Sequence, residues 1–124
     1  MRIDIRGRGV PLTAALLDHT EQRLRIALTR AGDRIERVVV RLGDANPAQG
    51  VGARFCRLSV MMKKAPPVRI VESGTDLYAA IDRAAERAGR NVAIRAGRLH
   101  ERVRPAMPLA VASSRGAAAD AFRN

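Results

Sequence analysis

The segment from Asp76 to Arg104 constrains the fold of this chain most, because it has the pattern of one long amphipathic helix. With an advance of about 100° per residue, its apolar residues gather on one face of the helix. They are Leu77, Ile81, Ala84, Ala88, Val92 and Leu99. Asp76 suits the N-cap position, because its carboxylate can accept an unpaired backbone N–H at the positive end of the helix. The rest of the chain must therefore supply an apolar surface against which this helix packs.

The same helix is expected to carry a row of arginines on the side nearly opposite its apolar face. This row contains Arg83, Arg87, Arg90 and Arg98. A helix that packs by one side and presents guanidinium groups on the other is suited to contact phosphates. Arginine rows are also common on ordinary solvated surface, and the helix by itself does not distinguish the two interpretations.

The charge of the whole chain favours a polyanionic partner. Its 124 residues, enough for one domain, include 23 Lys and Arg against 12 Asp and Glu, a net charge of +11. A domain this basic attracts nucleic acid, an anionic membrane or an acidic protein. Binding of single strands by base stacking usually needs several aromatic side chains, and this chain has Phe55, Tyr78 and Phe122. The composition therefore favours contact with the backbone and shape of a folded nucleic acid.

The residues before the long helix predict an α+β fold. Thr13 is the expected N-cap of a first helix that ends near Ala31, with Gly32 as its stop signal. Strands are expected over residues 2–6, 35–42, 54–62 and 68–72, with loops or turns over residues 43–52 and 63–67. The order is β-α-β-β-β-α, so the first two strands should be parallel and the later strands joined as hairpins. Both helices would then cover one face of a four-stranded sheet.

The opposite face of this sheet is expected to be basic. It would show Arg2, Arg6, Arg37, Arg41, Arg57 and Arg69 to solvent. Such residues can simply keep an exposed sheet face soluble. The same face would also carry Val39, Phe55, Met61 and Val71, which suggests an alternative in which the chain self-associates through the sheet.

The domain is expected to cover residues 1–104. Pro105 and Pro108 prevent the helix from continuing, and the residues that follow are mostly Ala, Ser and Gly. Residues 105–124 are therefore expected to form a flexible tail.

The sequence predicts neither an enzyme nor a metal or cofactor site. Cys56 lies within a strand pattern, where a buried structural thiol is expected rather than a nucleophile. His19 and His100 have no second ligand at metal-binding spacing on the same helix face. The carboxylates of the long helix are explained by pairing with arginines one turn away, such as Glu86 with Arg90. A single cysteine and the lack of an apolar span or signal core predict a cytoplasmic protein without membrane contact.

Three short motifs resemble those of the ribosome hibernation-promoting factors, also called ribosome-associated inhibitors. The motifs are DLYAAID at Asp76–Asp82, I-x-I-x-G at Ile3–Gly7 and L-T-x-A-L at Leu12–Leu16. Together with the order of elements, the resemblance covers about residues 2–102. Long members of that family add a second, dimerising domain, so this chain resembles the short type.

The resemblance implies a fold like that of double-stranded RNA-binding domains and a role in translation regulation under stress. Members of the family bind the small ribosomal subunit, occupy its decoding region and hold idle ribosomes inactive. Basic positions of the second helix contact ribosomal RNA in these proteins. The resemblance therefore implies that the RNA-binding residues of this chain are Arg83, Arg87, Arg90, Arg95, Arg98 and Arg102.

The chain departs from the family pattern within this helix. Ile94 and Ala96 stand where the family often has a basic residue. Gly89 and Gly97 each weaken a helix by roughly 1 kcal/mol relative to alanine. The leading hypothesis is a ribosome-binding translation inhibitor without catalytic activity. A self-associating interaction module and a general binder of structured RNA are the alternatives.

Overall fold

The structure is a computed structural model that describes residues 1–45 and 52–103, with side chains described as far as residue 97. The predicted tail, residues 105–124, lies outside the described residues, and so does the middle of the predicted loop at residues 46–51.

Four strands form one sheet, in the spatial order β1-β2-β3-β4. The strands are β1 (Arg2–Arg8), β2 (Ile35–Asp44), β3 (Arg54–Met62) and β4 (Ala65–Gly74), and the helices are α1 (Ala14–Leu28), the 3₁₀ helix η1 (Thr29–Arg34) and α2 (Leu77–Val103). β1 pairs in parallel with β2, and the other two pairs are antiparallel. The predicted α+β fold with β-α-β-β-β-α order is therefore confirmed.

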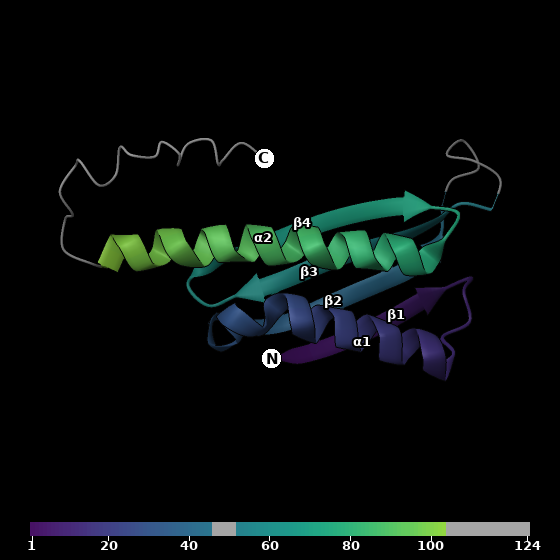
Figure 1. Cartoon of the computed structure of the whole chain (residues 1–124), viewed down its shortest axis with the longest axis horizontal. Helices are drawn as coiled ribbons and strands as arrows, with labels where there is room; N and C mark the ends of the chain where they lie inside the picture. Colours follow the sequence, from purple (N-terminus) through teal and green to yellow (C-terminus); the bar gives the residue numbers. More distant parts are fainter. Residues whose placement is uncertain (46–51, 104–124) are drawn as a thin grey trace.

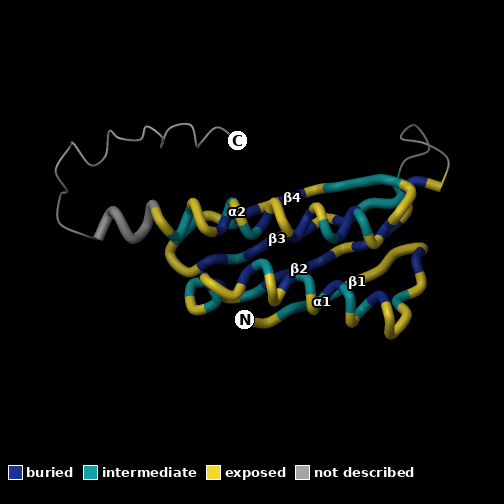
Figure 2. Tube along the Cα trace, in the orientation of Figure 1, coloured by how far each residue is buried: buried dark blue, intermediate teal, exposed yellow. Residues whose placement is uncertain are grey.

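Both long helices cover the same face of the sheet (Figure 1). α2 packs over β3 and β4 and beside α1, and the buried residues concentrate between the helices and the sheet (Figure 2). The alternation of β3 shows why, because Cys56, Leu58 and Val60 are buried at every second position. The core is thus a single layer between the sheet and the two helices.

Both predicted N-caps are present. The Thr13 hydroxyl accepts a hydrogen bond from the Leu16 N–H at 3.2 Å, and Asp76 Oδ1 accepts one from the Ala79 N–H at 3.2 Å. The apolar face of α2 is also as predicted through Val92, and it gains Ala80 and Ala85, both fully buried.

The predicted end of the first helix was wrong. α1 ends at Leu28, and the chain continues through the 3₁₀ helix η1 rather than stopping at a left-handed glycine. The Thr29 hydroxyl donates to the Arg25 carbonyl, and Gly32 does not have a positive φ. A 3₁₀ segment is a common way to end an α-helix, because its tighter hydrogen bonds occupy the last carbonyls.

Four strand ends also lie beyond the predicted ranges, and two of them are the ends of β1 at Arg8 and of β4 at Gly74. β2 extends through Gly43 and Asp44, and the turn before β4 contains only Lys63 and Lys64, with Lys64 at φ 59°. Pro66 and Pro67 therefore lie in a strand, but neither has a register partner on β3, because the β3–β4 pairing shifts between Val60 and Met62. This irregularity, at the edge of the sheet, tolerates residues that have no N–H to donate.

Gly89 lies at a close approach between α2 and α1. A Cβ added at Gly89 would stand 2.8 Å from the Ala27 carbonyl oxygen, which is backbone and cannot turn aside. A Cβ added at Gly97, which also lies in α2, would meet no atom within 4 Å. Gly89 thus has a packing reason that the sequence alone did not reveal, whereas Gly97 only weakens the helix.

We predict opposite effects for alanine at these two glycines. Gly89→Ala should lower the free energy of unfolding by about 1–3 kcal/mol, because the helices must separate. Gly97→Ala should raise it by up to about 1 kcal/mol, because only the helix propensity changes. Urea denaturation of both variants beside the parent protein measures this, and a stabilising Gly89→Ala would contradict the close contact.

Candidate nucleic-acid interface

Two of the predicted arginines hold α2 against the edge strand β4. Arg83 Nε lies 3.1 Å from Glu72 Oε1, and Arg87 Nη1 lies 2.7 Å from Glu72 Oε2. Both guanidinium groups also donate to backbone carbonyls of β4, Arg83 to Ser73 at 2.9 Å and Arg87 to Val71 at 3.3 Å. The Arg83 and Arg87 side chains remain 47% and 45% exposed, so they keep a surface toward solvent.

Arg95 makes a similar contact farther along the same edge. Its Nη1 donates to the carbonyl of Pro66 and, at 3.0 Å, to that of Pro67. An exposed edge strand invites pairing with another chain, because its outer carbonyls and N–H groups lack strand partners. Arginines of α2 therefore occupy carbonyls along β4 and protect this edge.

The carboxylate between Arg83 and Arg87 is biased toward its charged form by both arginines. The hydrogen bond from Arg87 is the main cause that lowers the pKa of Glu72 below its ordinary value of 4.5, and Arg83 acts in the same direction. Burial opposes this shift, but it is the smaller effect overall. Because the pKa is lower in the folded protein, this carboxylate stabilises the fold above pH 4.5 and ceases to do so as the pH falls through its folded pKa.

We predict that Glu72→Gln lowers the free energy of unfolding at pH 7 by about 1 kcal/mol. The difference from the parent should narrow as the pH falls below 4.5, because the parent then also carries a neutral side chain there. Urea titrations across this pH range measure it. Glu36→Gln, at an exposed position of β2, is the matched control and should show little difference at any pH. A pH-independent difference for Glu72→Gln would contradict the ion pair.

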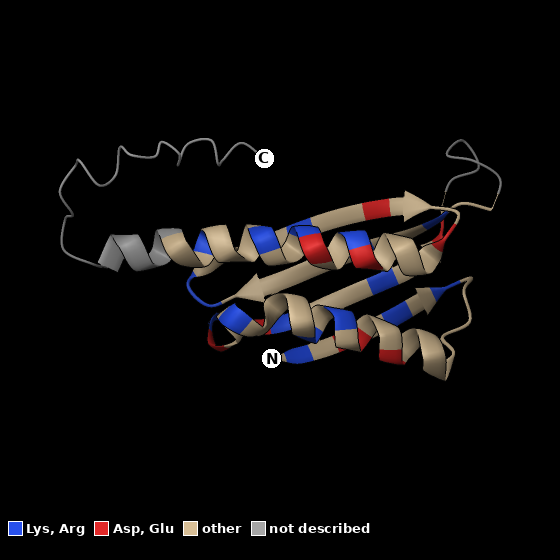
Figure 3. Ribbon diagram, in the orientation of Figure 1, with Lys and Arg blue, Asp and Glu red and all other residues tan. Residues whose placement is uncertain are grey.

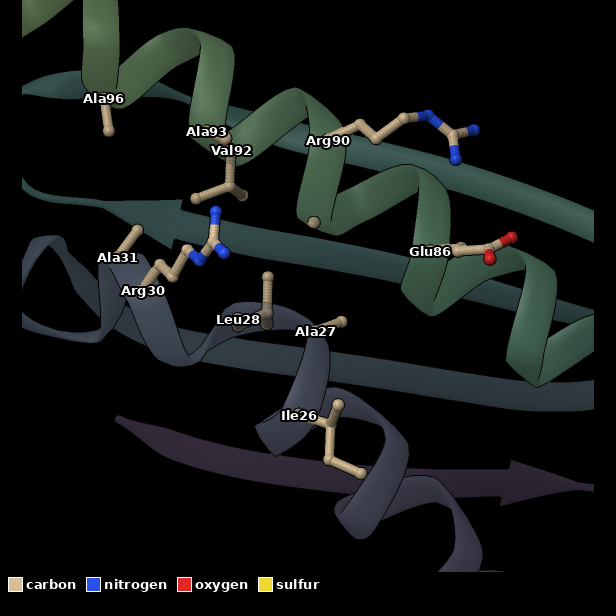
Figure 4. A pocket seen from close by; sticks show the side chains of 11 residues that line it. Ile26, Ala27, Leu28, Arg30, Ala31, Glu86, Arg90, Val92, Ala93 and Ala96 are labelled. Carbon is tan, nitrogen blue, oxygen red and sulfur yellow. The ribbon is translucent and has the colours of Figure 1, made fainter.

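Arg90 differs from its neighbours on α2. It is exposed, and no ion pair or hydrogen bond of its side chain occurs within the described part of the chain. Figure 4 shows it on the border of a groove of about 610 Å³ between α2 and the end of α1, pointing away from the groove. Arg30 extends from η1 toward α2 in the same groove, which is also lined by Ala27 and Ala93.

The predicted RNA-binding arginines of α2 therefore form one exposed surface only in part. Arg83, Arg87 and Arg90 are exposed on α2, and Arg95 is half-buried at the β4 edge. The side chains of Arg98 and Arg102 lie outside the described residues, although their backbone belongs to α2. Ile94, with 36% exposure, lies one helical turn beyond Arg90, where the family often has a basic residue.

The carboxylate Asp82 connects the two helices, contrary to the predicted pairing within one helix. His19 Nε2 lies 2.8 Å from Asp82 Oδ1, and Arg23 Nε lies 3.2 Å from the same oxygen. The His19 ring also meets the Tyr78 ring edge-on, with centroids 4.8 Å apart. An acidic partner for His19 was missed because it comes from the other helix, where sequence spacing gives no signal.

The outer face of the sheet is basic, as predicted. Arg2, Arg6, Arg41, Arg57 and Arg69 are exposed there. Arg37 is the exception, because it is half-buried and its Nη2 pairs with Asp4 Oδ2 at 2.9 Å. Figure 3 shows basic residues spread over both helices and the strands rather than on one element.

The apolar residues of that outer face do not form one exposed patch in the described structure. Val39 is only 8% exposed and Phe55 and Met61 are half-buried, whereas Val71 is 53% exposed. The predicted homodimer through this face stays a prediction.

Cys56 is a structural thiol. It is buried in β3, and burial together with the charge of Glu72 raises its pKa to about 12. Among the described residues, no three His, Cys, Asp or Glu side chains are grouped so that they could hold a metal ion. No described helix has both the length and the apolarity needed to cross a membrane.

We predict that native Cys56 does not react with a disulfide reagent such as dithionitrobenzoate. At pH 8 a pKa near 12 leaves roughly one thiolate in ten thousand, and burial blocks access to it. Absorbance should report one reactive thiol only after denaturation. The variant Val71→Cys, at an exposed position, should react at once, and rapid reaction of the parent protein would refute the buried assignment.

Comparison with known proteins gives a family match over most of the chain. The family model described as Sigma 54 modulation protein / S30EA ribosomal protein matches residues 3–100. Among solved structures, the N-terminal domain of protein Y from Thermus thermophilus is 32% identical with a TM-score of 0.62, and the match covers 74% of this chain and 96% of that one.

A second solved structure shares the fold at lower identity. The ribosomal subunit interface protein from Coxiella burnetii is 18% identical with a TM-score of 0.65, and the match covers 76% of this chain and 96% of that one. A comparison with curated proteins gave no match.

Proposed function

Because this chain belongs to the Sigma 54 modulation protein / S30EA ribosomal protein family, we propose that it binds the small ribosomal subunit and inhibits translation. Family membership confirms the resemblance drawn from the three sequence motifs. The family comprises ribosome-associated factors rather than enzymes, in agreement with the predicted non-enzymatic role.

The match over residues 3–100 is the observation that carries this proposal. It spans nearly all of the sheet and of both long helices, which supports the proposal that the described domain is the ribosome-binding unit. The proposed partners are the subunit and its ribosomal RNA in the cytoplasm, with no small-molecule substrate. Binding in the decoding region would hold idle ribosomes inactive, because the site of mRNA and tRNA would be filled.

We propose that the exposed arginines of α2 contact ribosomal RNA phosphates. Arg90 is the best candidate, because it is exposed and its guanidinium is not engaged by another described side chain. Arg83 and Arg87 share Glu72, which offsets part of their charge, but nearly half of each side chain is exposed for a phosphate. Arg95 contributes less directly, since its guanidinium holds the carbonyls of the β4 edge.

The structure identifies the variants that test this proposal without unfolding the protein. Arg87→Glu would place a second carboxylate beside Glu72 and confuse loss of folding with loss of binding. Arg90→Glu/Arg98→Glu keeps the Glu72 contacts. Lys63→Glu/Lys64→Glu, in the exposed turn between β3 and β4, makes the same change in charge at a different place and is the control.

We predict that the parent protein co-sediments with small ribosomal subunits at low salt and is released at high salt, because phosphate contacts release counterions. Arg90→Glu/Arg98→Glu should weaken binding by about tenfold or more, and the control should weaken it much less. Absence of binding by the parent at low salt would refute the proposed function. Equal binding by the parent and Arg90→Glu/Arg98→Glu would refute the role of α2.

A further inference from the structure

Three arginines stand side by side on three neighbouring strands of the outer sheet face. Arg6 on β1 is the register partner of Arg41 on β2, and Arg41 is the partner of Arg57 on β3. All three are exposed, on the face opposite the helices. Like charges directly opposite each other on a sheet repel and destabilise it. This arginine row is therefore more than a means of keeping the face soluble, for which mixed charges would suffice.

The surroundings of the arginine row leave its charge uncompensated. Asp4 is the one carboxylate on the outer face within the in-register rows of the described sheet, and it is paired with Arg37. Within the described residues, none of the three arginines has a carboxylate within 4 Å. The chain thus concentrates positive charge where no described carboxylate offsets it.

The arginine row also borders a shallow pocket in the sheet surface. Arg6, Arg8, Arg41, Phe55 and Arg57 line a depression of about 260 Å³ at this end of the sheet. The Arg57 guanidinium lies over the Phe55 ring, 5.4 Å from its centroid, which restricts the guanidinium to the sheet surface. Gly43 makes room for that ring, since a Cβ there would stand 2.8 Å from Phe55 Cε2.

We propose that this arginine row, with Arg8 beside it, binds the phosphate backbone of an RNA strand on the face opposite the helices. The inference rests on the proposed function, which supplies ribosomal RNA as the partner. Neighbouring strands lie about 4.8 Å apart, so the row spans about 10 Å. Each guanidinium can pair with one phosphate, so the row can contact roughly two or three phosphates of the strand. The domain would then contact RNA from two opposite sides.

The test compares Arg6→Gln/Arg41→Gln/Arg57→Gln with a matched variant that also loses three positive charges. Arg25→Gln/Lys63→Gln/Lys64→Gln serves as that control, because its residues are exposed and lie outside both proposed contact surfaces. Binding to purified small subunits is measured by co-sedimentation over a series of salt concentrations. Arg90→Glu/Arg98→Glu is included to report on the helix side separately.

The row variant should bind at least about tenfold more weakly at low salt, and the slope of log K against log salt should fall by about 2 to 3. The control should change both quantities far less. If the row variant binds like the parent while the helix variant loses binding, the row proposal is overturned and the proposed function stands. If the parent itself does not bind small subunits, both the row proposal and the proposed function are overturned.

Two measurements keep the test decisive. Relief of like-charge repulsion should offset the loss of the Arg57–Phe55 contact. The free row variant should therefore melt no lower than the parent, so misfolding should not explain weaker binding. In the parent, bound subunits should protect Arg41 and Arg57 from modification by hydroxyphenylglyoxal, read by peptide mass spectrometry, but not Arg25. Unchanged modification of Arg41 and Arg57 would overturn the proposal without any variant.

Other occupants of the face are outcomes that overturn the proposal. One such outcome is that the RNA-free parent sediments as a dimer, the row variant sediments as a monomer, and both bind subunits equally well. Another is that the parent floats with phosphatidylserine vesicles and the row variant does not, while both bind subunits equally well.

Discussion

The position of α2 on the sheet is the constraint on which the other features of this protein depend. Its apolar side is built mostly of alanine, so the helix lies close to β3 and β4, and Gly89 lets it lie close to α1. Its flank is fixed by arginines that hold Glu72 and the carbonyls of β4. The same placement decides which arginines are occupied within the protein and which face outward.

This arrangement gives the arginines of α2 two different physical roles. Arg95 and, in part, Arg83 and Arg87 stabilise the edge of the sheet, where an unprotected strand would invite association. Arg90 carries a charge that no described partner offsets. An arginine count on a helical wheel therefore overstates how much of the helix is available to RNA. The arginine row on the other face of the sheet adds exposed positive charge that α2 alone does not provide.

Much of the fold could be predicted from the sequence, because periodicity and capping are local properties. Alternation located the four strands, and Thr13 and Asp76 located the starts of both helices. The predicted ends of the elements were less accurate. Gly32 looked like a stop signal, yet α1 ends at Leu28 in a 3₁₀ segment, and Pro66 and Pro67 joined an edge strand that their residue types argued against. Both errors reflect tertiary surroundings that tolerate what local preference disfavours.

The sequence by itself determined the order of elements, the buried faces and the family, because these follow from short-range patterns and motifs. It also indicated that arginines occupy the outer sheet face and the exposed side of α2. Only the tertiary structure decided their partners. Asp82 meets His19 and Arg23 across the helices, and Arg6, Arg41 and Arg57 stand in one row. The physical reason is that strand register and helix docking join residues far apart in the chain, and no local spacing encodes those distances.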